Sequence, residues 1–357
     1  MLVRFLPLLM NPFILSILLL SLGLGTTLTF ASSHWLLAWI GLEISTLAII
    51  PLISQHHHPR AVEATTKYFI TQAAAAALIL FASTTNAWIT GQWDINFDLH
   101  FFPASILTMA LALKIGLAPV HFWLPEVLQG LDLTTGLILS TWQKLAPFIL
   151  MCQIIPVNSS LITFLGVTST LVGGWGGLNQ TQLRKILAYS SIAHLGWIIL
   201  VMQFNQQLAL LALIIYIPIT FSTFIIFKTN SSTTVNTLAA SWAKTPALTA
   251  ITPIILLSLG GLPPLSGFMP KWIILQELTK QDIPLTASIA ALSALLSLYF
   301  YLRVSYAMTL TISPNNLNAT TPWRLQTTAS TLPLAISATI SAMLLPLAPA
   351  TLALLSL

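Results

Sequence analysis

Long apolar segments follow one another along nearly the whole chain, and this feature most constrains how the chain can fold. Only 6% of the 357 residues are charged, whereas 56% are hydrophobic. Soluble domains carry about a quarter charged residues, because their surface must face water. A chain this poor in charge cannot cover itself in water. The sequence therefore predicts an integral membrane protein.

The apolar segments have the length of membrane-spanning helices. A helix needs about 20 mostly apolar residues to cross the hydrocarbon core of a bilayer, and this rule predicts about eleven crossings. Helices are expected, because backbone polar groups in hydrocarbon must be satisfied within their own segment. The alternation typical of a transmembrane barrel is missing. The predicted spans are 12–31, 34–53, 62–89, 103–119, 133–155, 160–178, 183–202, 207–227, 246–267 continuing as 271–278, 284–311 and 332–355.

Charges in the predicted loops indicate the orientation. On the side of the N-terminus the tail and loops hold Arg4, Arg60, Arg184, Lys185, Lys228, Lys244 and Arg324. The other side holds Asp94, Asp98, Glu277 and Asp282, with Lys280 as its main basic residue. The N-terminal side is therefore expected to face the compartment from which the chain is inserted, and an odd number of spans places the C-terminus opposite. The scattered charges form no basic run that would predict nucleic-acid binding.

Two of the spans are interrupted by prolines. The fourth reads LALKIGLAPVHFWLPEVLQG, and the ninth reads LSLGGLPPLSGFMPKW. Proline removes a backbone donor and clashes with the preceding turn, so both helices should open there. Lys114 comes before the first break, whereas Lys271 follows the second.

The two breaks fall at matching places in the predicted order of helices. Each lies in the fourth helix of a five-helix set, and paired interruptions of this kind are typical of inverted repeats in transporters. The sequence therefore predicts one membrane domain built from a first repeat at 10–155, an inverted second repeat at 159–311 and a C-terminal helix at 331–355. Two unrelated proline kinks are the alternative.

Four ionisable residues lie deep within predicted spans: Glu43, Lys114, Lys144 and Lys271. Such a side chain at mid-membrane costs about 2.5–3.5 kcal/mol even on a lenient scale, so something must offset the cost. Burial disfavours the charged form, whereas a neighbouring opposite charge favours it, so the protonation of one group depends on the next. These residues are therefore predicted to form a lateral chain of groups whose protonation states are coupled. Structural ion pairs and snorkelling lysines are the alternative.

Three further residues are weaker candidates. His194 lies in mid-span beside hydroxyl residues, and a histidine titrates near neutrality and can relay a proton. His121 follows the first break, where opened backbone could admit water. Lys67 lies about five residues into its predicted helix, where snorkelling to the interface is the simpler interpretation. The histidine tract at 56–60 is interpreted as a solvated loop rather than a metal site.

Several kinds of chemistry are excluded for the chain itself. Its single cysteine, Cys152, allows neither an internal disulfide nor an iron–sulfur cluster. The sequence has no phosphate-binding loop, no dinucleotide fingerprint and no nucleophile elbow. We therefore expect that this chain binds no cofactor and no metal.

Several segments, however, resemble a known family from Met10 to the C-terminus. They are ASSHWLLAWIGLEISTLAIIPL, HHHPRAVEATTKYF, LALKIGLAPVHFWLPEVLQGL, GLILSTWQKLAP, LNQTQLRKILAYSSIAHLGW and LSLGGLPPLSGFMPKW. Together they cover nearly the whole chain and are specific. The chain resembles the NADH dehydrogenase subunit 2 family of vertebrate mitochondria, most closely its ray-finned fish members. These are antiporter-like membrane-arm subunits of respiratory complex I.

The resemblance implies a role for each of the buried residues. Glu43 would be the glutamate of a Glu–Lys pair, with Lys114 as its partner. Lys144 would be the central lysine of the proton path. Lys271 would be the lysine of the second broken helix, leading to the outlet or to the next subunit. His194 and Lys185 would fall on the hydrophilic axis of the family.

The resemblance also implies the setting of the chain. It would contribute to proton translocation in a complex that oxidises NADH and reduces ubiquinone, with NAD, FMN, iron–sulfur clusters and ubiquinone bound by partner subunits. Its partners would be other membrane-arm subunits, especially neighbouring antiporter-like and small membrane subunits, together with membrane lipids. The location would be the mitochondrial inner membrane, with the N-terminus on the matrix side and the C-terminus on the intermembrane-space side. Residues 1–9 have no counterpart in the family and are expected to be an extension.

Two other functions remain open from the sequence. A self-sufficient cation/proton antiporter would share the lysines at broken helices. A purely structural arm subunit would use its charges only to set the register of its helices.

Overall fold

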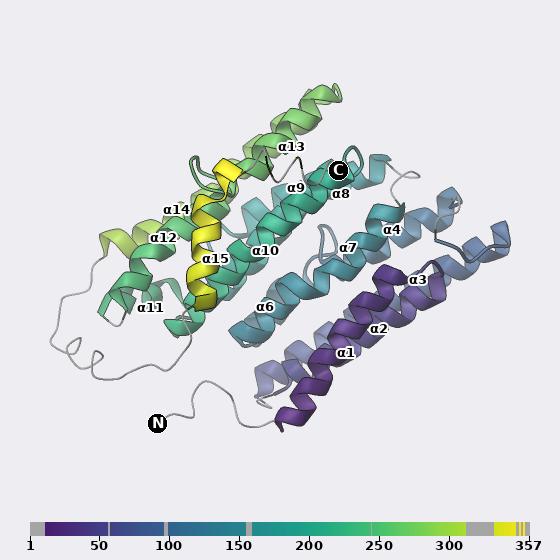
Figure 1. Ribbon diagram of the computed structural model, residues 1–357, viewed down its shortest axis with the longest axis horizontal. Coiled ribbons are helices and arrows are strands. Elements are labelled where there is room, and N and C mark those ends of the chain that lie inside the picture. The colour runs from purple at the N-terminus through teal and green to yellow at the C-terminus, as the bar shows by residue number, and fades with distance from the viewer. Residues whose placement is uncertain are drawn as a thin grey trace. The chain divides into compact units, whose positions relative to one another are not determined.

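The computed structural model describes residues 11–55, 58–95, 99–154, 159–243, 245–311 and 332–347, together with residues 350 and 353. Throughout this part the chain forms helices joined by short connections (Figure 1). The all-α fold is therefore confirmed. The expected extension at residues 1–9 lies outside the described residues, as do Asp98, Lys244 and Arg324 of the loop charges.

The chain divides into two compact units, Met1–Leu165 and Gly166–Leu357. The division falls inside α8 (Ser159–Gly176), the first helix of the predicted second repeat. The inverted relation between the two repeats stays a prediction, and each unit is described by itself.

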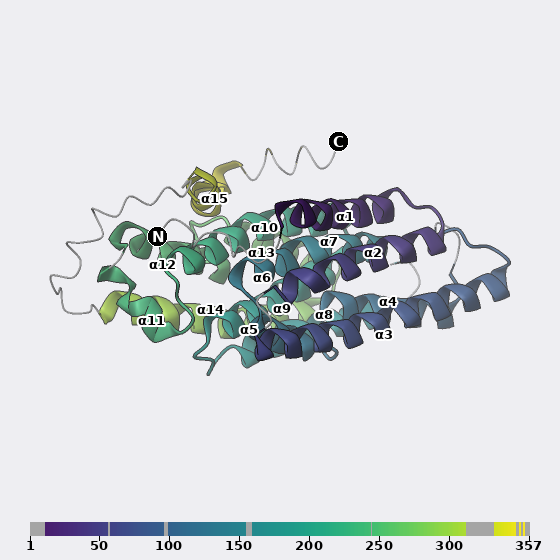
Figure 2. The ribbon, with the colours of Figure 1, turned by 90° about the horizontal axis from the view of Figure 1, so that it is seen from below.

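The first unit is a layered set of helices around α2. Its elements are α1 (Pro12–Ala31), α2 (Trp35–Ile53), α3 (Pro59–Thr90), α4 (Phe101–Ile115), α5 (Trp123–Gly130), α6 (Leu133–Thr141), the 3-10 turn η1 (Trp142–Lys144) and α7 (Leu145–Ile154). Helix α2 lies between α1 and α3, and α3 packs against both α4 and α5 (Figure 2). Side chains cap three of these helices at their N-termini, namely those of Asn11, His34 and His58. His58 belongs to the histidine tract, whose His56 and His57 lie outside the described residues.

The second unit is centred on α9 and α10. Its elements are the part of α8 from Gly166 on, α9 (Leu183–Met202), α10 (Gln206–Thr229), α11 (Val235–Ala239), the 3-10 turn η3 (Ala240–Ala243), α12 (Pro246–Gly260), α13 (Phe268–Lys280), α14 (Pro284–Leu310), α15 (Leu332–Met343) and the 3-10 turn η6 (Leu345–Leu347). Helix α10 packs against α9, α12, α13 and α15. The apolar window of α9 is 83% buried, which makes α9 the most buried long helix in the described part of the chain. The short helix α11 was not predicted.

Length and composition support a membrane protein. Among the described residues, seven helices are long and apolar enough to cross a bilayer. They are Pro12–Ala31, Trp35–Ile53, Pro59–Thr90, Leu133–Ile154, Leu183–Met202, Gln206–Thr229 and Pro284–Leu310. The predicted fourth, ninth and eleventh spans contain shorter apolar helices, and the sixth is α8. Every predicted span therefore contains a helix.

The C-terminal span differs from its prediction. A continuous helix was expected over 332–355, but α15 ends at Met343 and a 3-10 turn follows at Leu345–Leu347. Pro346 explains the difference, because its ring would clash with the carbonyl one turn earlier and it has no amide hydrogen to donate.

Candidate functional site

The first helix break lies between α4 and α5 in the first unit. Gly116 ends α4 in the left-handed conformation, with φ 86° and ψ 41°, which glycine adopts without a steric cost. The backbone amides of Gly116 and Leu117 both donate to the carbonyl of Ala112 at 2.9 Å. The chain resumes as a helix at Trp123, so the predicted opening of the fourth span is confirmed. Pro125 lies in the first turn of α5, where its missing amide hydrogen is not needed.

The indole of Trp123 closes this break. Its Nε1 donates to the carbonyl of Leu113 at 3.0 Å, which satisfies one of the carbonyls that the end of α4 leaves without an amide donor. Trp123 is 8% exposed, and its ring packs edge-to-face on Tyr68 of α3 with centroids 5.9 Å apart. Trp123 therefore links the end of α4 to both α5 and α3.

Trp123→Phe is expected to destabilise the first unit by about 1–3 kcal/mol, because the part-buried carbonyl of Leu113 loses its donor. Phenylalanine keeps an aromatic ring at this place, so the loss combines the indole hydrogen bond with the space that the smaller ring leaves unfilled. The midpoint of heat denaturation measures the effect. Trp88→Phe is the matched control, since Trp88 is 89% exposed. Equal midpoints for the two variants would contradict the prediction.

Lys114 lies in the last turn of α4, directly before the break. It is buried, and within the described chain its Nζ has no hydrogen-bond partner. The charge of Glu43 on α2 acts on Lys114, although no ion pair shorter than 4 Å joins the two among the described residues. Glu43 is half-buried, and its Oε2 also has no hydrogen-bond partner within that part of the chain. Glu43 and Lys114 are thus close enough to interact electrostatically, but they make no direct ion pair in the described part of the chain, and their pairing stays a prediction.

Lys144 lies in a distortion that the sequence analysis missed. The predicted fifth span is interrupted by the 3-10 turn η1, and Lys144 is its last residue. Pro147 accounts for the turn, because its ring clashes with the carbonyl four residues earlier, at Gln143. Lys144 is buried at this point.

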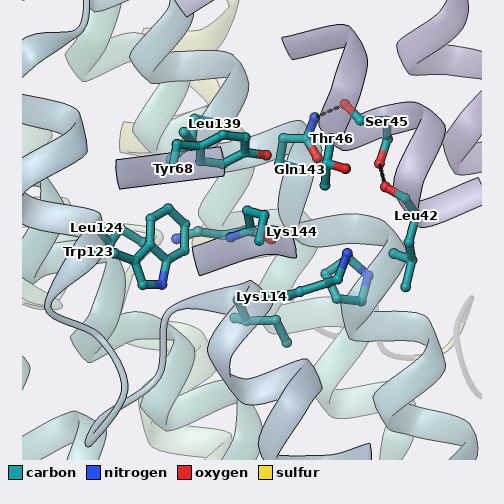
Figure 3. A pocket seen from close by; sticks show the side chains of 13 residues that line it. Leu42, Ser45, Thr46, Tyr68, Lys114, Trp123, Leu124, Leu139, Gln143 and Lys144 are labelled. Atoms are coloured by element: carbon teal, nitrogen blue, oxygen red, sulfur yellow. Dashed lines mark hydrogen bonds between the residues drawn. The ribbon is translucent and has the colours of Figure 1, made fainter. Parts of the chain in front are cut away.

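Lys114 and Lys144 line one small cavity. Its volume is about 10 Å³, close to the room that a single water molecule needs. Figure 3 shows both lysines with Tyr68 and Trp123 around this space. Gln143 also lines it, and its side-chain amide donates to the carbonyl of Ser45 on α2 at 2.9 Å. Residues far apart in the sequence therefore share one water-sized space, which the two lysines and Gln143 line together with apolar side chains.

Lys67 of α3 lies in a cluster of charges rather than at the cavity. Its Nζ is 2.7 Å from Oε1 of Glu63 and 2.7 Å from Oε2 of Glu126. The side chain of Lys67 is 41% exposed, that of Glu63 is 62% exposed and that of Glu126 is 53% exposed. Neither glutamate was among the predicted site residues. The spacing of Glu63 and Lys67 by one helical turn was a usable signal, whereas Glu126 is 59 residues from Lys67.

His121 lies in the connection between α4 and α5, as predicted. It is buried, with its Nδ1 3.3 Å from the carbonyl oxygen of Pro119 and its ring 4.4 Å from that of Phe122. It therefore belongs to the packed wall of the break.

The second break lies between α12 and α13 in the second unit. Helix α12 ends at Gly260, earlier than the predicted 267, because Gly261 adopts the left-handed conformation with φ 78° and ψ 40°. The chain resumes as a helix at Phe268, and Lys271 lies in the first turn of α13. Lys271 is buried, and its Nζ donates to the carbonyl of Gly260 at 2.7 Å. A cation is stabilised at this place by the partial negative charge of a helix C-terminus.

The two breaks share one pattern. Residues 116–126 and 261–271 correspond one to one: each begins with a left-handed glycine, contains a cis peptide bond before proline and restarts a helix at the same position. In this register Glu126 occupies the position of Lys271. Lys114 corresponds to a leucine of α12. The repeated pattern argues against two unrelated proline kinks.

Two further candidates lie on α9 in the second unit. His194 is in the middle of the helix, half-buried, with its ring 5.5 Å from that of Tyr216 on α10. Lys185 is in the first turn of α9 and is also half-buried. The hydroxyl groups of Ser190 and Ser191 donate to backbone carbonyls of their own helix.

The helical fold and the buried lysines at broken helices define an antiporter-like membrane protein. Residues 32–297 match the family model described as NADH:quinone oxidoreductase/Mrp antiporter, transmembrane. Residues 298–352 match that of the NADH dehydrogenase subunit 2 C-terminus. The chain belongs to the NADH dehydrogenase subunit 2 family.

Relatives and solved structures agree with this assignment. The chain is 97% identical to NADH-ubiquinone oxidoreductase chain 2 of Gadus morhua, over 98% of this chain and 100% of that protein. It is 69% identical to the chain of the same name from Salmo salar, with the same coverage. A chain of respiratory complex I from Thermus thermophilus superposes with a TM-score of 0.84 at 26% identity, over 96% of this chain and 80% of that one. A chain of the Mrp complex from a Dietzia species shares the fold, with a TM-score of 0.79 at 16% identity over 95% and 75% of the two chains.

Proposed function

We propose that this chain is a core membrane-arm subunit of NADH:ubiquinone oxidoreductase and contributes to proton translocation through its buried Glu and Lys residues. One observation carries the proposal: Lys114 and Lys144 line the same water-sized cavity at a helix break, with the charge of Glu43 acting on Lys114. The names of its relatives in Gadus morhua and Salmo salar support its assignment to this enzyme.

The geometry of the first unit is suited to passing protons between charged groups. Burying the amine of Lys114 in apolar surroundings costs free energy, and the negative charge of Glu43 on α2 offsets part of that cost. A second proton on Lys144, across the cavity, opposes the charge on Lys114. Protonation of each group therefore depends on the state of the other, as a relay requires. A single water molecule in the cavity would carry the proton between them.

In the second unit Lys271 is the proposed carrier. The carbonyl of Gly260 accepts its hydrogen bond, so the end of α12 stabilises the protonated amine. His194, Lys185 and His121 are proposed as secondary members of the path. No redox step is assigned to this chain: NADH oxidation and ubiquinone reduction, with NAD, FMN, iron–sulfur clusters and ubiquinone, belong to partner subunits.

The surface of the chain supports burial among lipids and other membrane subunits. Large apolar side chains are exposed along its helices, among them Phe13 at 70%, Leu20 at 67% and Leu310 at 77%. We propose neighbouring antiporter-like and small membrane subunits as partners, in the mitochondrial inner membrane. The loop charges favour the N-terminus on the matrix side and the C-terminus on the intermembrane-space side.

Glu43→Gln tests the proposal in the assembled complex. Glutamine keeps the shape of the side chain but removes the charge that acts on Lys114, so the number of protons moved per NADH oxidised should fall while assembly is unchanged. The measurement combines NADH oxidation with proton uptake in sealed vesicles. An unchanged ratio in a normally assembled complex would favour the structural alternative.

A second arm of this experiment uses the purified chain alone in liposomes. The proposed subunit should not exchange sodium or potassium for protons, because its driving reaction lies in other subunits. Exchange at a rate that depends on Lys114 would instead establish a self-sufficient antiporter.

A further inference from the structure

Helix α5 is too short to hold its own position. It has eight residues, and isolated helices of that length are unstable in water. Its place in the unit must therefore come from contacts with neighbouring helices. Helix α3 provides most of them, both through apolar packing and through the ion pair of Lys67 and Glu126.

The ion pair and the aromatic contact lie side by side on the same two helices. Tyr68 follows Lys67 directly on α3, and Trp123 lies three residues before Glu126 on α5, on the same face of that helix. Lys67 binds Glu126 at 2.7 Å, and the Tyr68 and Trp123 rings are 5.9 Å apart. A polar and an aromatic contact thus hold one turn of α5 against one turn of α3.

This turn of α5 also contacts the neighbourhood of Lys114. Trp123 donates to the carbonyl of Leu113, the residue before Lys114, and its ring lines the cavity that both lysines share. A displacement of α5 would therefore move the end of α4 and change the cavity. Lys67 does not line that cavity, so any influence it has on Lys114 must pass through α5.

We infer that Lys67 and Glu126 are a positioning pair, which holds α5 against α3 and thereby fixes the break beside Lys114. This inference rests on the proposed function, since Lys114 is the group whose surroundings the pair controls. It changes the role of Lys67 from a secondary carrier of protons to a residue that acts through its partner.

The repeated pattern of the breaks supports this inference independently. Glu126 occupies the position that Lys271 holds in the second unit, and Lys271 reaches back directly to the end of α12. In the first unit the residue at the same position, Glu126, instead forms an ion pair with Lys67 on α3. In both units an ionisable residue in the first turn of the restarted helix makes the polar contact that anchors that helix.

The test uses the assembled complex and three variants. Lys67→Met and Glu126→Gln each break the pair. Glu63→Gln is the matched control, because it removes the other carboxylate beside Lys67 but leaves α3 tied to α5. The readouts are the protons moved per NADH oxidised, the dependence of that ratio on pH and the amount of assembled complex.

We expect both pair-breaking variants to lower the ratio by about twofold or more and to shift its pH profile, whereas the control leaves both unchanged. The decisive variant exchanges the charges, combining Lys67→Glu with Glu126→Lys in the Glu63→Gln background, so that two carboxylates are not placed one turn apart. Restoration of most of the ratio supports a positioning pair. If the single variants assemble poorly, restoration of both assembly and ratio by the exchange supports it equally.

Two results would overturn the inference. Single variants that assemble and translocate normally would show that the pair has no role in positioning the break. An exchange as defective as the single variants would show that the pairing of the two charges is not what translocation requires. Failure of the proposed function would look different, because Lys114→Met would then leave the ratio unchanged.

Discussion

Lys114→Met is expected to abolish proton movement through this chain while the complex still assembles. Methionine has nearly the length of lysine and no charge, so it fits a buried site without a desolvation cost. With the amine removed, a proton would have to occupy an apolar break, at a cost of several kcal/mol. Since about 1.4 kcal/mol corresponds to a tenfold change, movement by this route should fall by at least tenfold.

The measurement compares protons moved per NADH oxidised in sealed vesicles that contain the variant or the native complex. Lys280→Met is the matched control, because Lys280 is exposed at the end of α13 and pairs only loosely with Glu277, at 3.9 Å. The control should retain the native ratio. A normal ratio for Lys114→Met in an assembled complex would show that this lysine carries no protons.

Gly261→Ala is expected to disable the second break by displacing Lys271. An alanine Cβ at this position would lie 2.8 Å from Cδ of Lys271 and 3.0 Å from its Nζ, closer than van der Waals contact allows. The lysine side chain would have to shift, which disturbs its hydrogen bond to the carbonyl of Gly260. The left-handed backbone, with φ 78°, adds a cost of about 1–2 kcal/mol for any residue with a Cβ.

A matched control separates the two effects. Gly91 also has a left-handed backbone, with φ 74°, but a Cβ there would meet no atom within 4 Å. Gly91→Ala should therefore reproduce the backbone cost and leave proton translocation unchanged. Gly261→Ala should lower the protons moved per NADH oxidised in a complex that still assembles. Equal ratios for the two variants would show that the position of Lys271 is unimportant for translocation.

The helices and their breaks were predictable because their causes are local. The length of an apolar run decides whether it can span a bilayer, and helix α9 begins and ends at the predicted residues 183 and 202. Proline and glycine act on their own turn of the chain, so the breaks near Gly116 and Gly261 were expected in the right spans. The 3-10 turn at Lys144 has an equally local cause in Pro147, and that signal was overlooked.

The composition of the candidate site was only partly predictable. The cost of burying charge singled out Glu43, Lys114, Lys144 and Lys271 from the sequence, because such groups are rare in spans. Their burial is confirmed for the three lysines, and the roles of all four stay predictions. The continuation of the path from Lys144 to Lys271 also stays a prediction.

By itself, the sequence determined that the chain is a helical membrane protein with two matched breaks and buried charges close to them. Only the tertiary structure decided which charges meet. It placed Lys144 on the same cavity as Lys114, and it paired Lys67 with Glu126 across 59 residues. The physical reason is that helix formation depends on neighbours within one turn, whereas these contacts depend on how helices far apart in the chain pack.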